Sequence, residues 1–141
     1  MNGKRAAPTT ATLRDVSGRY SPSEAARRSG FSLDTLRYYE KIGLLSGIGR
    51  TTGGRRVFTD EDLSWLEVFR CLRDTGMPIA EMCRYAELAR DGDHTVRERQ
   101  ELLERHAGRV EEQMALLRAQ YDHLRDKIRY YERVAAAVPA G

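Results

Sequence analysis

The segment from Thr95 to about Val134 constrains the fold most, because it has a helical pattern throughout and contains no proline. Only Gly108 weakens it. Apolar residues recur every seven positions on two neighbouring series, which are Ala107, Met114, Tyr121 and Ile128, and Leu103, Val110, Leu117, Leu124 and Tyr131. This spacing predicts one long helix with a narrow apolar seam, as in a coiled coil.

A seam sustained over about four heptads needs a partner helix. A chain of 141 residues is about the size of one ordinary domain, so a helix folded back on its own head would leave much of the seam uncovered. We therefore predict a homodimer joined through residues 94–141. The predicted dimerisation contacts are Leu103, Val110, Met114, Leu117, Tyr121, Leu124 and Ile128.

Two short helices are predicted ahead of this segment. Ser21 has the pattern of an N-cap before Pro22, and Gly30 ends the helix after about two turns. Ser32 caps a second helix, which stops at Gly43. Two short helices joined by a tight turn form a helix-turn-helix. The polar residues that the second helix offers away from its apolar stripe include Thr35, Arg37, Tyr38 and Lys41.

A β-hairpin is predicted next, with strands at Ile48–Thr51 and Arg55–Phe58 and a turn at Gly53-Gly54. Arg50, Arg55 and Arg56 cluster on it. A hairpin with a basic tip directly after a helix-turn-helix is typical of a wing, which grips the phosphate backbone beside the groove.

Two further helices are predicted between the hairpin and the long helix. Thr59 caps the first, which closes at Thr75-Gly76, and Met77-Pro78 opens the second. On the second we expect an apolar side that includes Ile79 and Cys83. The predicted organisation is a flexible basic arm (1–19), a winged helix-turn-helix head (20–76), a linking helix (77–93) and the coiled-coil helix with a short tail (94–141).

The charge is distributed unevenly along the chain. Residues 1–58 carry eleven basic and four acidic side chains, whereas residues 59–141 carry thirteen basic and seventeen acidic ones. A basic head suits a polyanion such as double-stranded DNA. No apolar run is long enough for a membrane span or a secretory signal, so we expect a cytoplasmic protein. No catalytic constellation, cofactor motif or metal-ligand cluster is found, so we expect neither an enzyme nor a metalloprotein.

The stretch from Tyr20 to Asp91 strongly resembles the MerR family of bacterial transcription regulators. The residues that carry the resemblance are Ser32, Thr35, Leu36, Arg37, Tyr38, Tyr39, Glu40, Gly43, Leu44, Arg50, Arg56, Phe58, Thr59, Glu61, Asp62 and Leu63. The chain departs from the family pattern in the wing. Where the family usually has Gly-Tyr-Arg-x-Tyr, this chain reads Gly54-Arg55-Arg56-Val57-Phe58, so two hydroxyls are lost and one charge is gained.

The resemblance implies a mainly α protein, with a winged helix-turn-helix head and a long antiparallel coiled-coil dimerisation helix. In the family, such a dimer binds a palindrome inside a promoter whose spacer is too long. An effector then makes the dimer distort the DNA so that RNA polymerase reads both promoter elements, which is a form of indirect readout. The implied DNA contacts are Thr35, Arg37, Tyr38, Arg50 and Arg56.

Three hypotheses concern what the protein senses or binds. Phe69–Arg73 resembles the segment of the aldehyde- and electrophile-responsive subgroup that carries a lone cysteine, which makes Cys71 the candidate sensor. A rival hypothesis is that the same scaffold senses a small organic molecule without covalent chemistry. A third is a coiled-coil assembly protein whose basic head binds acidic protein surfaces. Cys83 lies mid-stripe on its helix and is predicted to be core.

Overall fold

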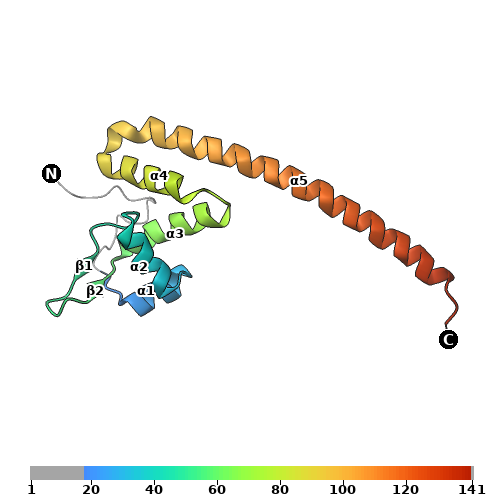
Figure 1. Ribbon diagram of the computed structural model, residues 1–141, viewed down its shortest axis with the longest axis horizontal. Helices are drawn as coiled ribbons and strands as arrows, with labels where there is room; N and C mark the ends of the chain where they lie inside the picture. Colours follow the sequence, from blue (N-terminus) through green and yellow to red (C-terminus); the bar gives the residue numbers. More distant parts are fainter. Residues whose placement is uncertain (1–17, 141) are drawn as a thin grey trace. The chain divides into compact units, whose positions relative to one another are not determined.

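The computed structural model describes residues 18–140 (Figure 1). The predicted basic arm therefore lies almost wholly outside the described residues. The elements are α1 (Pro22–Ser29), α2 (Leu33–Lys41), β1 (Gly49–Arg50), β2 (Arg56–Val57), α3 (Asp60–Asp74), α4 (Ile79–Asp91), the 3-10 helix η2 (Asp93–Thr95) and α5 (Val96–Ala137). The fold is mainly helical, as predicted. No helix within the described residues is long and apolar enough to cross a membrane.

The caps of α1 and α2 confirm the predicted helix-turn-helix. The Ser21 hydroxyl accepts a hydrogen bond from the backbone N–H of Glu24, and the Ser32 hydroxyl accepts one from the backbone N–H of Thr35. Gly30 ends α1 with φ +81°, a left-handed conformation that other residues rarely adopt. These local signals fix where α2 starts.

The hairpin is present, but its strands are shorter than predicted. Only Gly49–Arg50 and Arg56–Val57 form the antiparallel ladder, with Gly49 opposite Val57 and Arg50 opposite Arg56. Thr51 N–H still donates to Arg55 O at 2.7 Å, but Thr51 O accepts from Gly54 N–H at 2.9 Å and Arg55 N–H donates to the Thr51 hydroxyl, so the reciprocal ladder bond does not form. At the other end, Tyr20 forms an antiparallel bridge to Phe58, a contact that the sequence pattern did not predict.

The core of the head lies between α3, α4 and the two short helices. Trp65, Leu66, Phe69 and Leu72 form the buried stripe of α3. Trp65 is only 3% exposed and packs its ring 5.5 Å from Phe69 and 6.1 Å from Tyr85, centroid to centroid. A capping box begins α3, in which Thr59 and the buried Asp62 each accept the other's backbone N–H.

The prediction for α4 was partly wrong. Ile79 is exposed and Cys83 is only half-buried, whereas Tyr85 and Leu88 join Met82, Ala86 and Ala89 inside. Ile79 is the first residue of the helix. A helical turn of 3.6 residues places Met82, Ala86 and Ala89 at the centre of the apolar stripe, and Tyr85 and Leu88 on its other border.

Helix α5 is continuous over 42 residues, a length of about 63 Å. The chain divides into two compact units inside this helix, between Leu102 and Leu103. Leu103 and Val110 are half-buried, and every residue from 111 to 140 is exposed. The predicted seam from Met114 onward is therefore open to solvent in the single chain.

Candidate nucleic-acid interface

The predicted recognition residues lie on the outer face of α2. Leu36 and Tyr39 are buried beneath the helix, which leaves Arg37, Tyr38 and Lys41 exposed and Thr35 half-buried. Arg37 pairs with Asp34 at 2.9 Å on the same face. Because both are highly exposed, this pair is weak and leaves the guanidinium available to a stronger anion. The face presents hydroxyls and cations, which suit base edges and phosphates.

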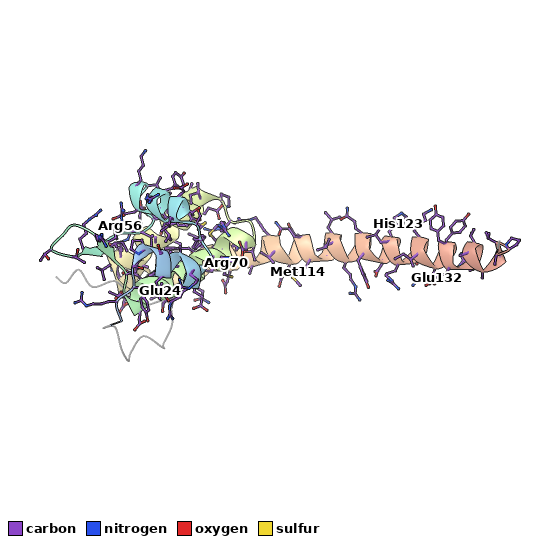
Figure 2. The ribbon with its side chains drawn as sticks, turned by 90° about the horizontal axis from the view of Figure 1, so that it is seen from below. Glu24, Arg56, Arg70, Met114, His123 and Glu132 are labelled. Atoms are coloured by element: carbon purple, nitrogen blue, oxygen red, sulfur yellow. The ribbon has the colours of Figure 1, made fainter. Side chains whose placement is uncertain are left out.

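The three arginines of the wing have different environments. Arg55 is exposed, and its side chain makes no ion pair or hydrogen bond within residues 18–140. The Arg50 guanidinium donates to Gly54 O at 2.9 Å and so braces the turn. Arg56, which Figure 2 labels on the hairpin, is 31% exposed, and its Nε donates to a carboxylate oxygen of Glu40. Of the three wing arginines, Arg55 is therefore the one whose guanidinium has no hydrogen-bond or ion-pair partner within residues 18–140.

Glu40 is a further residue of this interface, and no sequence pattern assigns it a role. The residue sits in the last turn of α2 and is half-buried beside the wing. Its partner Arg56 is sixteen residues away in the sequence. No local periodicity or cap pattern predicts a contact at that separation, so only the fold reveals it.

Two further arginines, one on α3 and one on α4, donate hydrogen bonds to backbone carbonyls of the helix-turn-helix. Arg70 of α3 donates to Ser29 O at the end of α1, 2.9 Å away, and also pairs with Asp74. Hydrogen bonds from Arg70 and Arg73 hold the pKa of Asp74 below its usual value, so this carboxylate keeps its charge in mild acid. Arg90 of α4 donates to Gly43 O at 2.6 Å, directly after α2. Arg70 thus ties the end of α1 to α3, and Arg90 ties the segment after α2 to α4.

The two cysteines differ in accessibility. Cys71 is exposed on α3, and its sulfur makes no hydrogen bond within the described residues. Burial, with Glu87 nearby, raises the pKa of the half-buried Cys83 thiol, which keeps it in the less nucleophilic protonated form. No group of three or more His, Cys, Asp or Glu side chains in residues 18–140 is arranged to hold a metal ion.

Comparison with sequence families gives two overlapping matches. Residues 20–88 match the profile described as MerR HTH family regulatory protein, and residues 63–127 match the profile described as MerR, DNA binding. The first covers α1 through most of α4, and the second covers most of α3, all of α4 and α5 as far as Lys127. The candidate interface and most of the long helix are therefore included.

Individual relatives agree with the profiles. An uncharacterized HTH-type transcriptional regulator of Haemophilus influenzae is 41% identical over 117 residues, covering 83% of this chain and 87% of that protein. The HTH-type transcriptional regulator AdhR of Bacillus subtilis is 36% identical over 57% of this chain and 58% of its own length. A similar solved structure is that of HiNmlR, described as a MerR family regulator lacking the sensor domain and bound to promoter DNA. It superposes on this chain with a TM-score of 0.77 and is 40% identical in sequence, and the match covers 84% of this chain and 94% of HiNmlR.

Proposed function

This chain belongs to the MerR family of DNA-binding transcriptional regulators, and from that membership we propose that it binds promoter DNA as a homodimer and distorts an overlong promoter spacer for RNA polymerase. Promoter activation then depends on the energy of DNA deformation rather than on new base contacts. The similarity to regulators favours this hypothesis over a coiled-coil assembly protein.

One observation carries the DNA-binding proposal. The exposed face of α2, with Arg37, Tyr38 and Lys41, belongs to the same compact unit as a wing whose tip carries the unengaged Arg55. A recognition helix reads the major groove while the wing grips the backbone beside it. HiNmlR, which shares this fold, was crystallised on promoter DNA.

The dimer proposal rests on the seam of α5. Met114, Leu117 and Leu124 are each about 60% exposed or more in the single chain. A row of large apolar side chains on one face of a helix is stable in water when another helix covers it. We propose that the partner is a second copy, antiparallel to the first, which places two heads on one palindromic site.

The purified protein should protect a palindromic site in its own upstream region from nuclease, with an affinity that falls steeply as salt rises. Arg55→Ala should reduce the slope of log K against log salt by about 0.9 for each phosphate that the variant no longer neutralises. The same charge change at the exposed Arg97, at the start of α5, should leave the slope unchanged. The absence of any protected site would refute the regulator proposal.

For the effector, we propose that Cys71 senses reactive aldehydes or other electrophiles. Its exposure on α3 supports this proposal, because a reagent in solution reaches the sulfur directly. The thiolate would form a C–S bond to the carbonyl carbon, the C–O π bond would break with its electron pair passing to oxygen, and that oxygen would take a proton from water. The neighbouring Arg70 braces α1, so an adduct on α3 would lie next to a contact of the DNA-binding unit.

Cys71→Ser is expected to abolish the aldehyde-dependent rise in transcription while leaving operator affinity within about twofold, since a surface substitution of this size costs little stability. A reporter fused to the target promoter measures the response. Cys83→Ser is the matched control and should respond like the wild type. A retained response in Cys71→Ser would remove Cys71 from the mechanism.

An open groove supports the alternative of a non-covalent effector. It lies between α4, η2 and the first turn of α5 and has a volume of about 470 Å³, within the size range of small-molecule sites. Charged side chains of Arg84, Glu87 and Glu98 line it, together with the buried Thr95. A ligand bound there would act in Cys71→Ser as well as in the wild type, so the same reporter experiment separates the two hypotheses.

A further inference from the structure

The charges at the base of the wing form an unusual arrangement. Arg50 and Arg56 are direct partners in the two-residue ladder between β1 and β2. Like charges opposite each other in an antiparallel pair destabilise it. Glu40 of α2 offsets this repulsion, because one carboxylate oxygen accepts from Arg56 Nε and the other lies 3.9 Å from Arg50 Nη2.

The same carboxylate joins two parts of the interface. Within residues 18–140, the side-chain ion pairs between α2 and the wing both run through Glu40. The side chains of Glu40 and its two arginines are each less than half exposed, so their attraction is stronger than that of a fully exposed pair. Glu40 therefore sets where the wing stands relative to the recognition helix.

A carboxylate in this position also has a cost for DNA binding. Phosphates attract Arg50 and Arg56, and Glu40 competes with the phosphates for the same guanidinium groups. It also places a negative charge beside a polyanion. While Arg56 is held by Glu40, it contributes less to the backbone contacts that bind any DNA sequence.

We propose that Glu40 is a positioning and specificity-determining residue: it orients the wing against α2 and holds Arg56 away from phosphate, which limits binding to non-operator DNA. The proposal rests on the proposed DNA-binding function. It reassigns Arg56 from a phosphate contact to the brace of the wing, and it leaves the phosphate contact of the wing to Arg55.

Glu40→Gln tests this proposal, because the amide oxygen still accepts from Arg56 while the charge is removed. Binding of the intact protein to its operator and to random-sequence DNA is measured by fluorescence anisotropy across a series of salt concentrations. The slope of log K against log salt should steepen by about 0.9 per protomer as Arg56 becomes free to pair with phosphate. Affinity for random DNA should rise by about tenfold, at least as much as affinity for the operator.

Two variants isolate the cause. Glu67→Gln makes the same charge change at an exposed position of α3 and should leave the slope unchanged. In Glu40→Gln/Arg56→Gln the added slope should disappear, because the guanidinium that would pair with phosphate is gone. The proposal would be overturned if the slope were unchanged in Glu40→Gln, or if it changed equally in Glu40→Gln and Glu67→Gln. Either result would leave the proposed DNA-binding function intact, provided that the wild type binds its operator. Failure of the wild type to bind DNA at all would instead refute the proposed function.

Discussion

Leu117→Asp is expected to convert the protein from a dimer into a monomer and to lower operator affinity by about three orders of magnitude, because the seam no longer holds two heads on one site. Leu117 is 67% exposed in the single chain, so the substitution removes no packing that the monomer needs for folding. In the proposed dimer it replaces a buried leucine with a carboxylate in both copies. Removing the apolar side chain and burying a charge together cost about 3 kcal/mol per copy or more.

Leu116 supplies the matched control. It is 62% exposed, nearly the same as Leu117, but it lies outside the two heptad series. Leu116→Asp should therefore remain a dimer. Sedimentation equilibrium gives the association state of both variants, and anisotropy on operator DNA gives their affinities. A dimeric Leu117→Asp, or equal dissociation of both variants, would contradict the seam assignment.

Gly30→Ala is expected to destabilise the head by about 2–3 kcal/mol, the largest single loss that we anticipate from adding one methyl group. The left-handed φ of +81° costs a non-glycine residue about 1–2 kcal/mol. The new Cβ would also collide with the Arg70 guanidinium, which must then give up its hydrogen bond to Ser29 O, worth about 1 kcal/mol at this partly exposed site.

The corresponding glycine after α2 separates these two contributions. Gly43 has φ +86°, but a Cβ there meets nothing within 4 Å. Gly43→Ala should therefore show the backbone cost alone, about 1–2 kcal/mol. In an Arg70→Ala background, Gly30→Ala should become no more costly than Gly43→Ala. Urea unfolding monitored at equilibrium measures all four variants, and equal losses in Gly30→Ala and Gly43→Ala would refute the role of Arg70.

The elements of the head that follow from local rules could be predicted from the sequence. Ser21, Ser32 and Thr59 cap helices because their hydroxyls reach a backbone N–H three residues on, which is a property of neighbouring residues alone. Trp65, Leu66, Phe69 and Leu72 recur at helical spacing, so the buried stripe of α3 also follows from neighbouring residues. The long α5 followed from its uninterrupted seven-residue repeat.

Features that depend on distant contacts could not be predicted in this way. The pairing of Glu40 with Arg56, the bond from Arg70 to Ser29 O and the bond from Arg90 to Gly43 O join residues 16, 41 and 47 positions apart. The sequence places all three arginines on the wing, and the family resemblance implies Arg50 and Arg56 as its DNA contacts. The fold distinguishes them, because only Arg55 lacks a side-chain partner within the described residues.

Trp65 gives this protein a single intrinsic fluorescence reporter. It is the only tryptophan in the chain, and it packs against the aromatic rings of Phe69 and Tyr85 in the first compact unit. Its emission therefore reports unfolding of the DNA-binding unit alone, whereas far-ultraviolet circular dichroism weights the 42-residue α5 most heavily. Coincident melting curves from the two signals would mean that the units unfold cooperatively, and separated curves would give a stability for each.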